Sequence, residues 1–100
     1  MERWARERGE IQSVWLFGSR VRGNHRSDSD LDIGVRLYGD EKERLAIWIF
    51  EGACWAASLQ ELVSVKIHLE LADPVNSPDK VWSAVQAYGR KVFDREELGL

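Results

Sequence analysis

Two aspartates separated by one residue are the first candidates for chemistry in this sequence. Asp30 and Asp32 lie in the segment 30–37, where apolar and polar residues alternate as in a half-buried strand. This spacing places both carboxylates on one face of the strand, with Cα atoms about 6–7 Å apart. Two carboxylates this close repel each other unless a cation is bound. Because Mg²⁺ prefers carboxylate and phosphate oxygens, the pair is a candidate metal site; the alternative is a solvent-facing strand edge that carries two acids.

A Gly-Ser turn precedes the aspartates. Gly18 and Ser19 follow an apolar run over 12–17 that is typical of a strand. Glycine has no Cβ, so a phosphate can approach its backbone closely, and the Ser19 hydroxyl adds a donor. Backbone N–H groups at the start of the following helix also attract anions. Such turns are common, but this turn and the aspartates together supply a phosphate cradle and a metal clamp, as nucleotidyl transfer requires.

Other charged residues crowd the same segment and have two interpretations. Arg20 and Arg22 either neutralise a triphosphate or balance the aspartates on an exposed helix, and Arg26 adds to this positive charge. We interpret His25 and Asp28 as solvated loop residues.

The elements that position these residues alternate between helices and strands. We expect helices over 1–9, 19–23, 41–59 and 78–89, and strands over 12–17, 30–37, 63–71 and 91–93. The expected N-caps are Ser19, Asp40 and Ser77, with Pro78 at the first position of the last helix. The pattern predicts an α/β (α+β) fold: a small mixed β-sheet with helices packed on its apolar face.

Composition narrows the class of protein. One hundred residues, 44% hydrophobic and 31% charged, indicate one globular domain spanning 1–100. A net charge of −3 argues against general nucleic-acid binding. The single cysteine, Cys54, cannot form an internal disulfide, and it lies in an apolar run that we expect in the core. Residues 1–10 are charged rather than apolar, unlike a secretory signal, and the single cysteine suits a reducing compartment, so we expect a cytoplasmic protein. The apolar run at 45–59 is too short to span a membrane.

Gly18-Ser19, ten intervening residues and Asp30-Leu31-Asp32 together resemble the GS-x10-D-x-D signature of the nucleotidyltransferase superfamily. The finer pattern agrees at four further positions, which are Phe17, Arg20, Gly23 and Ser29. The sequence GRKVFD at 89–94 is similar to the usual ending of the minimal nucleotidyltransferases, the MNT group. The resemblance extends over most of the chain.

The resemblance implies an α/β fold with a mixed sheet, in which Asp30 and Asp32 hold Mg²⁺ or Mn²⁺ and serve catalysis. It implies that Gly18 and Ser19 bind the phosphates of ATP, and we add Arg20 to the nucleotide-binding set because it follows the turn. Many minimal members are antitoxins paired with a HEPN-domain toxin, and some transfer AMP from ATP to a tyrosine of that partner. The implied protein is therefore a Mg²⁺-dependent adenylyltransferase with a HEPN partner, in a homo- or hetero-oligomer.

One departure from the family pattern concerns a third carboxylate, which usually stands on the following strand in a sequence such as V-D-L. The matching place here is Val65-Lys66-Ile67, so a lysine replaces the acid. His68 lies one strand repeat away and is a candidate base, whereas we expect Glu70 to be part of a polar, exposed strand face. The departure leaves two hypotheses: an enzyme, or an antitoxin that neutralises its partner by contact with weak or no catalysis. Transfer to a small molecule would require a substrate domain that this length excludes unless an oligomer supplies it.

The long helix is apolar around its circumference, because Glu51 is the only charged residue between 45 and 59. A helix that packs only on a sheet shows a polar stripe, so a second element or a partner must cover this one. Trp48 and Trp55 lie on the same helical face, and we expect part of that face in a subunit interface. The alternative is burial beneath the terminal helices, which carry Trp4 and Trp82.

Overall fold

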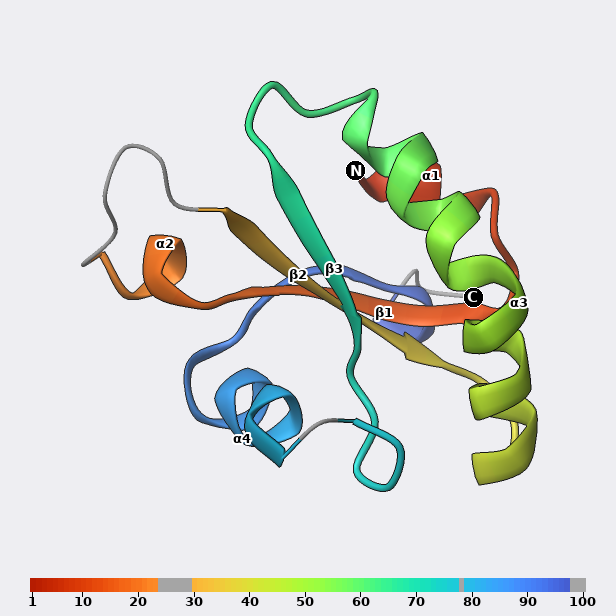
Figure 1. Cartoon of the computed structure of the whole chain (residues 1–100). Coiled ribbons are helices and arrows are strands. Elements are labelled where there is room, and N and C mark those ends of the chain that lie inside the picture. Colours follow the sequence, from red (N-terminus) through yellow and green to blue (C-terminus); the bar gives the residue numbers. More distant parts are fainter. Residues whose placement is uncertain (24–29, 78, 98–100) are drawn as a thin grey trace.

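The structure is a computed structural model that describes residues 1–23, 30–77 and 79–97 (Figure 1). Its elements follow in the order α1 (Glu2–Arg6), β1 (Ile11–Phe17), α2 (Ser19–Arg22), β2 (Leu31–Leu37), α3 (Glu41–Gln60), β3 (Ile67–Leu71), α4 (Asp79–Tyr88), β4 (Arg90–Asp94) and the 3₁₀ turn η1 (Arg95–Glu97). Asp40 caps α3 as expected, because its carboxylate accepts a hydrogen bond from the Glu43 N–H at 2.9 Å. Pro78 lies outside the described residues.

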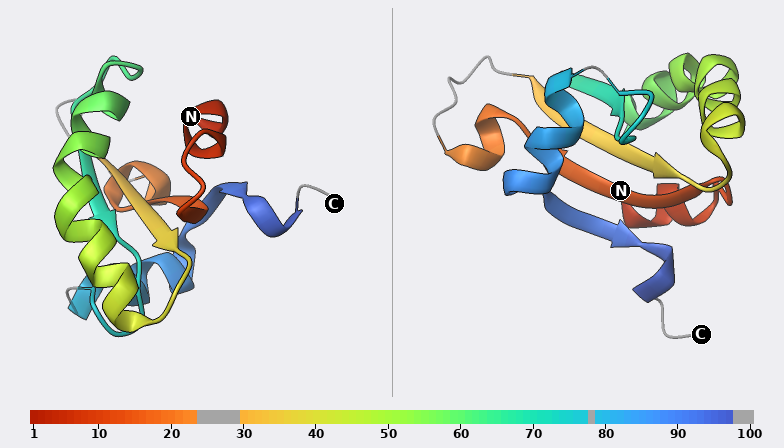
Figure 2. Two further views of the ribbon diagram at one scale, coloured as in Figure 1. Left: turned by 90° about the vertical axis from the view of Figure 1, so that its right-hand side faces the viewer. Right: turned by 90° about the horizontal axis from the view of Figure 1, so that it is seen from below.

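The strands form one mixed sheet in the order β3-β2-β1-β4 (Figure 2). β1 pairs antiparallel with β2 and with β4, whereas β2 pairs parallel with β3 through the crossover that contains α3. The predicted fold class is confirmed. The aspartate-bearing strand β2 is central, and it lies between the strand that ends at the Gly-Ser turn and the strand that carries His68.

Helices cover both faces of this sheet. α1 and α3 pack on one face, where Trp4 and Trp55 meet edge to face at 6.4 Å above Ile33 and Val35. α4 packs on the opposite face in a separate apolar cluster that contains Phe17, Ala72 and Val85. Gly34 makes this second layer possible, because a Cβ there would lie 3.2 Å from Ala72 Cβ and 3.4 Å from Val85 Cγ2. The expectation of helices on the apolar face therefore holds for α1 and α3 but not for α4.

Two local expectations are wrong. β3 begins at Ile67 rather than at residue 63, because the Gln60 side chain donates to the carbonyls of Val63 and Val65 and accepts from the Ile67 N–H. These bonds hold residues 63–66 as a loop. Ser19 does not cap α2: Gly18 occupies the N-cap position and no side chain caps this helix.

The orientation of α3 corrects two further expectations. The helix buries Gly52, Trp55 and Leu59. Trp55 therefore belongs to the core of this chain and not to an interface, while Trp48 is half-buried. Cys54 is exposed rather than buried, because it lies next to Trp55 in the sequence and points away from the sheet. Within the described segments, no helix has the length and apolarity needed to cross a membrane.

Candidate functional site

The Gly-Ser turn and the aspartates meet at one end of the two central strands. Because β1 and β2 are antiparallel, the end of β1 lies beside the start of β2, and Phe17 pairs with Asp32. Gly18 and Ser19 follow Phe17 directly, and Asp30 immediately precedes β2. Figure 1 shows α2 beside this end of β2, so the structure brings the sequence-predicted turn and carboxylates together.

Gly18 has a conformation and a position that only glycine satisfies. Its φ of 82° lies in the left-handed region that L side chains rarely adopt. A Cβ on Gly18 would overlap the Asp32 carboxylate, which lies directly against this backbone. Gly23, which ends α2, has a similar φ of 81°, but a Cβ there would meet nothing within 4 Å. Because Gly18 has no side chain, the Asp32 carboxylate can lie directly against the backbone of the turn.

The Asp32 carboxylate is held in surroundings that disfavour its charge. Burial is the main factor that raises the pKa of Asp32, and the nearby charge of Asp30 raises it further. His68 opposes this rise through its charge and its hydrogen bond, with Nδ1 3.4 Å from Asp32 Oδ1. A bound cation would lower the free energy of the charged carboxylates, so the electrostatics favour cation binding at this position.

The residue that faces Asp32 from the neighbouring strand is His68, not Lys66. In the parallel register of β2 and β3, Asp32 pairs with His68 and Gly34 pairs with Glu70. Lys66 precedes β3, is exposed, and uses its carbonyl to accept the Leu31 N–H. The sequence alone did not identify this pairing, because it depends on the register between two strands that α3 separates.

Glu70 is a site residue that sequence reasoning missed. We expected an exposed position, but Glu70 is half-buried and its Oε1 lies 2.7 Å from His68 Nε2. His68 thus stands between two carboxylates, with Nδ1 towards Asp32 and Nε2 towards Glu70. The alternation of polar and apolar residues over 63–71 already indicated that His68 and Glu70 lie next to each other on one strand face.

The carboxylates fit a metal that is also held by phosphate oxygens. Among the residues that the structure describes, no group of three or more His, Cys, Asp and Glu side chains is arranged to hold a metal ion. Asp30 and Asp32 supply two hard oxygen donors on one face, and Mg²⁺ is usually held by one or two carboxylates together with substrate phosphates. The donor set therefore suits Mg²⁺ or Mn²⁺ delivered with a nucleotide.

Of the remaining candidates, the structure describes Arg20 next to this centre. Arg20 lies in α2 directly after the turn and is half-buried. His25, Arg26 and Asp28 fall outside the described residues.

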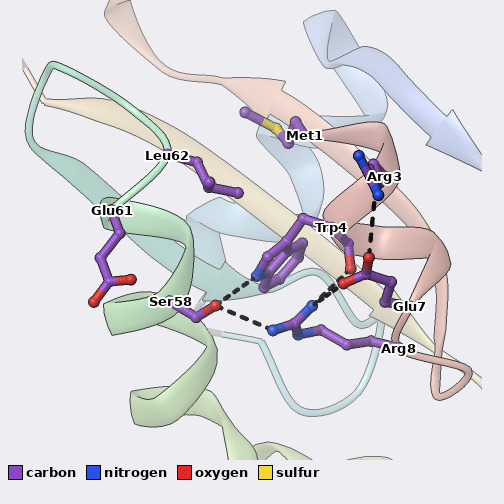
Figure 3. A pocket seen from close by; sticks show the side chains of 8 residues that line it. All are labelled: Met1, Arg3, Trp4, Glu7, Arg8, Ser58, Glu61 and Leu62. Atoms are coloured by element: carbon purple, nitrogen blue, oxygen red, sulfur yellow. Dashed lines mark hydrogen bonds and ion pairs between the residues drawn. The ribbon is translucent and has the colours of Figure 1, made fainter.

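A hollow of about 570 Å³ lies elsewhere, between α1 and the end of α3 (Figure 3). Arg8 stacks on the Trp4 ring at 4.5 Å, and both side chains donate to Ser58 Oγ. None of the sequence-predicted site residues lines this hollow, so we interpret it as part of the packing contact between α1 and α3.

Comparison with known proteins supports the fold. Residues 1–98 match the family described as Polymerase beta, Nucleotidyltransferase. A crystal structure of a toxin-antitoxin with AMP-PNP is 21% identical, with a TM-score of 0.62 over 89% of this chain and 66% of that chain. A double aspartate-to-glutamate mutant of the toxin-antitoxin MntA-HpeT is 20% identical, with a TM-score of 0.59 over the same shares. This chain thus spans 66% of the length of each, and at such identities the likeness shows the fold.

No curated protein is significantly similar to the chain. The family match nevertheless extends over nearly the whole sequence and includes the Gly-Ser turn, both aspartates and the four strands. The chain belongs to the Polymerase beta nucleotidyltransferase family.

Proposed function

We propose that this chain is a Mg²⁺-dependent antitoxin of the MNT group that transfers AMP from ATP to a tyrosine hydroxyl of a HEPN-domain toxin in the cytoplasm. The observation that carries the proposal is the close approach of the Gly18 backbone to the Asp32 carboxylate, the two groups to which we assign phosphate and metal binding. Two toxin-antitoxin structures share the fold, and one of them was determined with AMP-PNP. In the other, two aspartates were replaced by glutamate.

Each site residue has a role in this reaction. The backbone of Gly18 and the hydroxyl of Ser19 contact the nucleotide phosphates, and Arg20 offsets their charge. Asp30 and Asp32 would hold a Mg²⁺ ion, and that ion would stabilise the charge that develops on the phosphoryl oxygens. The tyrosine oxygen forms a bond to the α-phosphorus, pyrophosphate leaves, and the phenolic proton passes to a base.

We assign His68 as the acceptor of that proton and Glu70 as the residue that orients the His68 ring. The Nδ1 atom of His68 lies on the Asp32 side of the ring, and the opposite ring nitrogen is bonded to Glu70. A tyrosine has a pKa near 10, far below that of an aliphatic alcohol, so it requires only a weak base. This demand suits the imidazole of His68, which pairs with Asp32 across the two strands.

Replacing His68 by Ala is expected to lower the rate of AMP transfer about 100-fold, the usual contribution of a general base. Glu70→Gln keeps the side-chain shape but weakens the orienting bond, so we expect a loss of about 10-fold. Both variants should bind Mg²⁺-ATP within about threefold of the unchanged protein, because neither side chain is assigned to the nucleotide. Lys66→Ala is the matched control and should retain full activity. Equal losses in Lys66→Ala and His68→Ala would refute the assignment of the base.

The Gly18 close approach predicts a selective effect on nucleotide binding. Gly18→Ala and Gly23→Ala both place an alanine at positive φ, so each should lose at least about 1–2 kcal/mol of folding stability. Only the Cβ at Gly18 displaces the Asp32 carboxylate. Calorimetric titration with Mg²⁺-ATP should therefore show binding to Gly23→Ala and none to Gly18→Ala. Similar binding by the two variants would contradict the proposed coupling between turn and metal ligand.

A second candidate function is that of a silent antitoxin, which binds a nucleotide but inhibits its partner by contact alone. Its support is Lys66, which stands where the family pattern has a third carboxylate. The two functions differ in the response to an added acid. A silent antitoxin should label nothing as the unchanged chain and gain labelling in His68→Asp or Lys66→Asp.

A further inference from the structure

The side of α3 that faces away from the sheet is apolar and uncovered. Six residues on this side are exposed, and we call them the outer α3 face: Ala46, Ile49, Phe50, Ala53, Cys54 and Ala57. Phe50 is 84% exposed and Ile49 is 70% exposed, the largest values among the exposed large apolar side chains. Figure 2 shows α3 as the outermost layer over the sheet, and none of the described helices or strands covers its outer side. An exposed apolar face of this kind marks a contact surface.

The residues of this face are arranged symmetrically about the middle of the helix. If two copies of α3 pair antiparallel about the midpoint between Glu51 and Gly52, Phe50 of each copy faces Ala53 of the other. The same pairing sets Ala46 against Ala57 near the two ends. Large side chains then meet small ones, which allows two helices to pack closely.

Charge supports the same pairing. Lys42 and Glu61, both exposed, stand at equal distances from the midpoint, so each Lys42 meets Glu61 of the other copy. A parallel pairing would instead place Lys42 on Lys42 and Phe50 on Phe50. Opposite charges at the two ends therefore select the antiparallel arrangement and reject the parallel one.

We infer that the outer α3 face binds the same face of a second copy of this chain, in a two-fold antiparallel helix pair. The proposal is independent of the proposed function. Asp32 and His68 lie on the opposite face of the sheet, with α4, so the pairing leaves both candidate sites open. A homodimer with two separate sites would present them on its outer surfaces.

Cross-linking tests the geometry of the pair. In a Cys54→Ala background, Ala46→Cys and Ala57→Cys are prepared as separate proteins. In the antiparallel pair each introduced cysteine lies eleven helical residues, about 16 Å, from the same position in the other copy, which is too far for a disulfide. Each variant alone should therefore remain uncross-linked under mild oxidation, and mixing the two should give a covalent dimer. A cross-link in Ala46→Cys alone, or none in the mixture, would overturn the antiparallel pairing.

Sedimentation measures the strength of the pair with matched controls. Phe50→Glu should raise the dimer dissociation constant at least about 100-fold, whereas Leu62→Glu should leave it unchanged, because Leu62 is 63% exposed but lies outside the outer α3 face. Lys42→Glu should weaken the pair about 10-fold, and adding Glu61→Lys should restore it to within about threefold. Circular dichroism checks that each variant is folded. A monomeric parent chain at 100 μM, or an equal response of Phe50→Glu and Leu62→Glu, would show that another protein or segment covers this face.

Discussion

Asp32→Asn is expected to lower AMP transfer at least about 1,000-fold while leaving the fold equally stable or slightly more stable. The loss follows from removal of a metal-holding charge, and it corresponds to about 4 kcal/mol of transition-state stabilisation. The free energy of unfolding should not fall in Asp32→Asn, because burial raises the pKa of Asp32 in the folded chain. A carboxyl group with a raised folded pKa destabilises the protein at neutral pH, and this penalty disappears as the pH falls. Asparagine removes the penalty at every pH.

Asp94→Asn is the matched control for this variant. Burial would raise the pKa of Asp94, but hydrogen bonds from Lys91 and from the Glu96 backbone outweigh it and lower the pKa. Its removal should therefore slightly reduce thermal stability at pH 7 and leave AMP transfer unchanged. Transfer assays and thermal unfolding on the two variants should give opposite patterns. Residual transfer above one tenth in Asp32→Asn would remove Asp32 from the metal site.

Asp73→Asn is expected to destabilise the chain by about 3 kcal/mol at pH 7, because it breaks a buried ion pair on one side. Asp73 is 1% exposed, and its carboxylate accepts from Arg44 Nε at 2.5 Å and from the Val75 N–H at 2.8 Å. Burial alone would raise the pKa of Asp73, but the bonds from Arg44 and from the Val75 and Asn76 backbones lower it to about 2. This network joins α3 to the turn after β3, and thus supports the strand that carries His68.

The pH dependence identifies the source of that stability. A carboxyl group whose pKa falls from 3.8 to about 2 on folding contributes about 2 kcal/mol above pH 4, and this contribution is lost as the pH falls towards 2. Urea unfolding at several pH values should show this loss in the parent chain and a smaller one in Asp73→Asn. Glu96→Gln, at an exposed position, should keep the parent profile. Identical profiles in the parent and Asp73→Asn would disprove the assignment.

Local patterns predicted the parts of the fold that depend on neighbouring residues. The alternation over 30–37 and the Asp40 cap gave β2 and the start of α3 nearly to the residue. The Gly18-Ser19 turn and the aspartates were found as a pair because their chemistry is visible in residue type and spacing. What the sequence did not show depends on contacts between distant segments. Gln60 ends the alternation before Ile67 through side-chain bonds to the loop.

Orientation and register account for the other differences. Whether Cys54 or Trp55 faces the sheet depends on the rotation of α3, which an almost wholly apolar helix does not reveal. The position of His68 opposite Asp32 depends on the parallel register of β2 and β3. The contact between Glu70 and His68 can be linked to Asp32 only once that register is known. From the sequence, Glu70 was therefore expected to be a solvent-exposed side chain.

Direct detection of AMP on a protein tyrosine tests the central claim. The chain is incubated with a HEPN-domain protein from a neighbouring reading frame, if its genome carries one, with Mg²⁺ and α-labelled ATP, and the partner is analysed by peptide mass spectrometry. The account predicts that the unchanged chain adds one AMP unit to a partner tyrosine, and that the combined Asp30→Asn and Asp32→Asn variant adds none although it still folds. No labelling by the unchanged chain, together with labelling by His68→Asp, would contradict the account and identify a silent antitoxin.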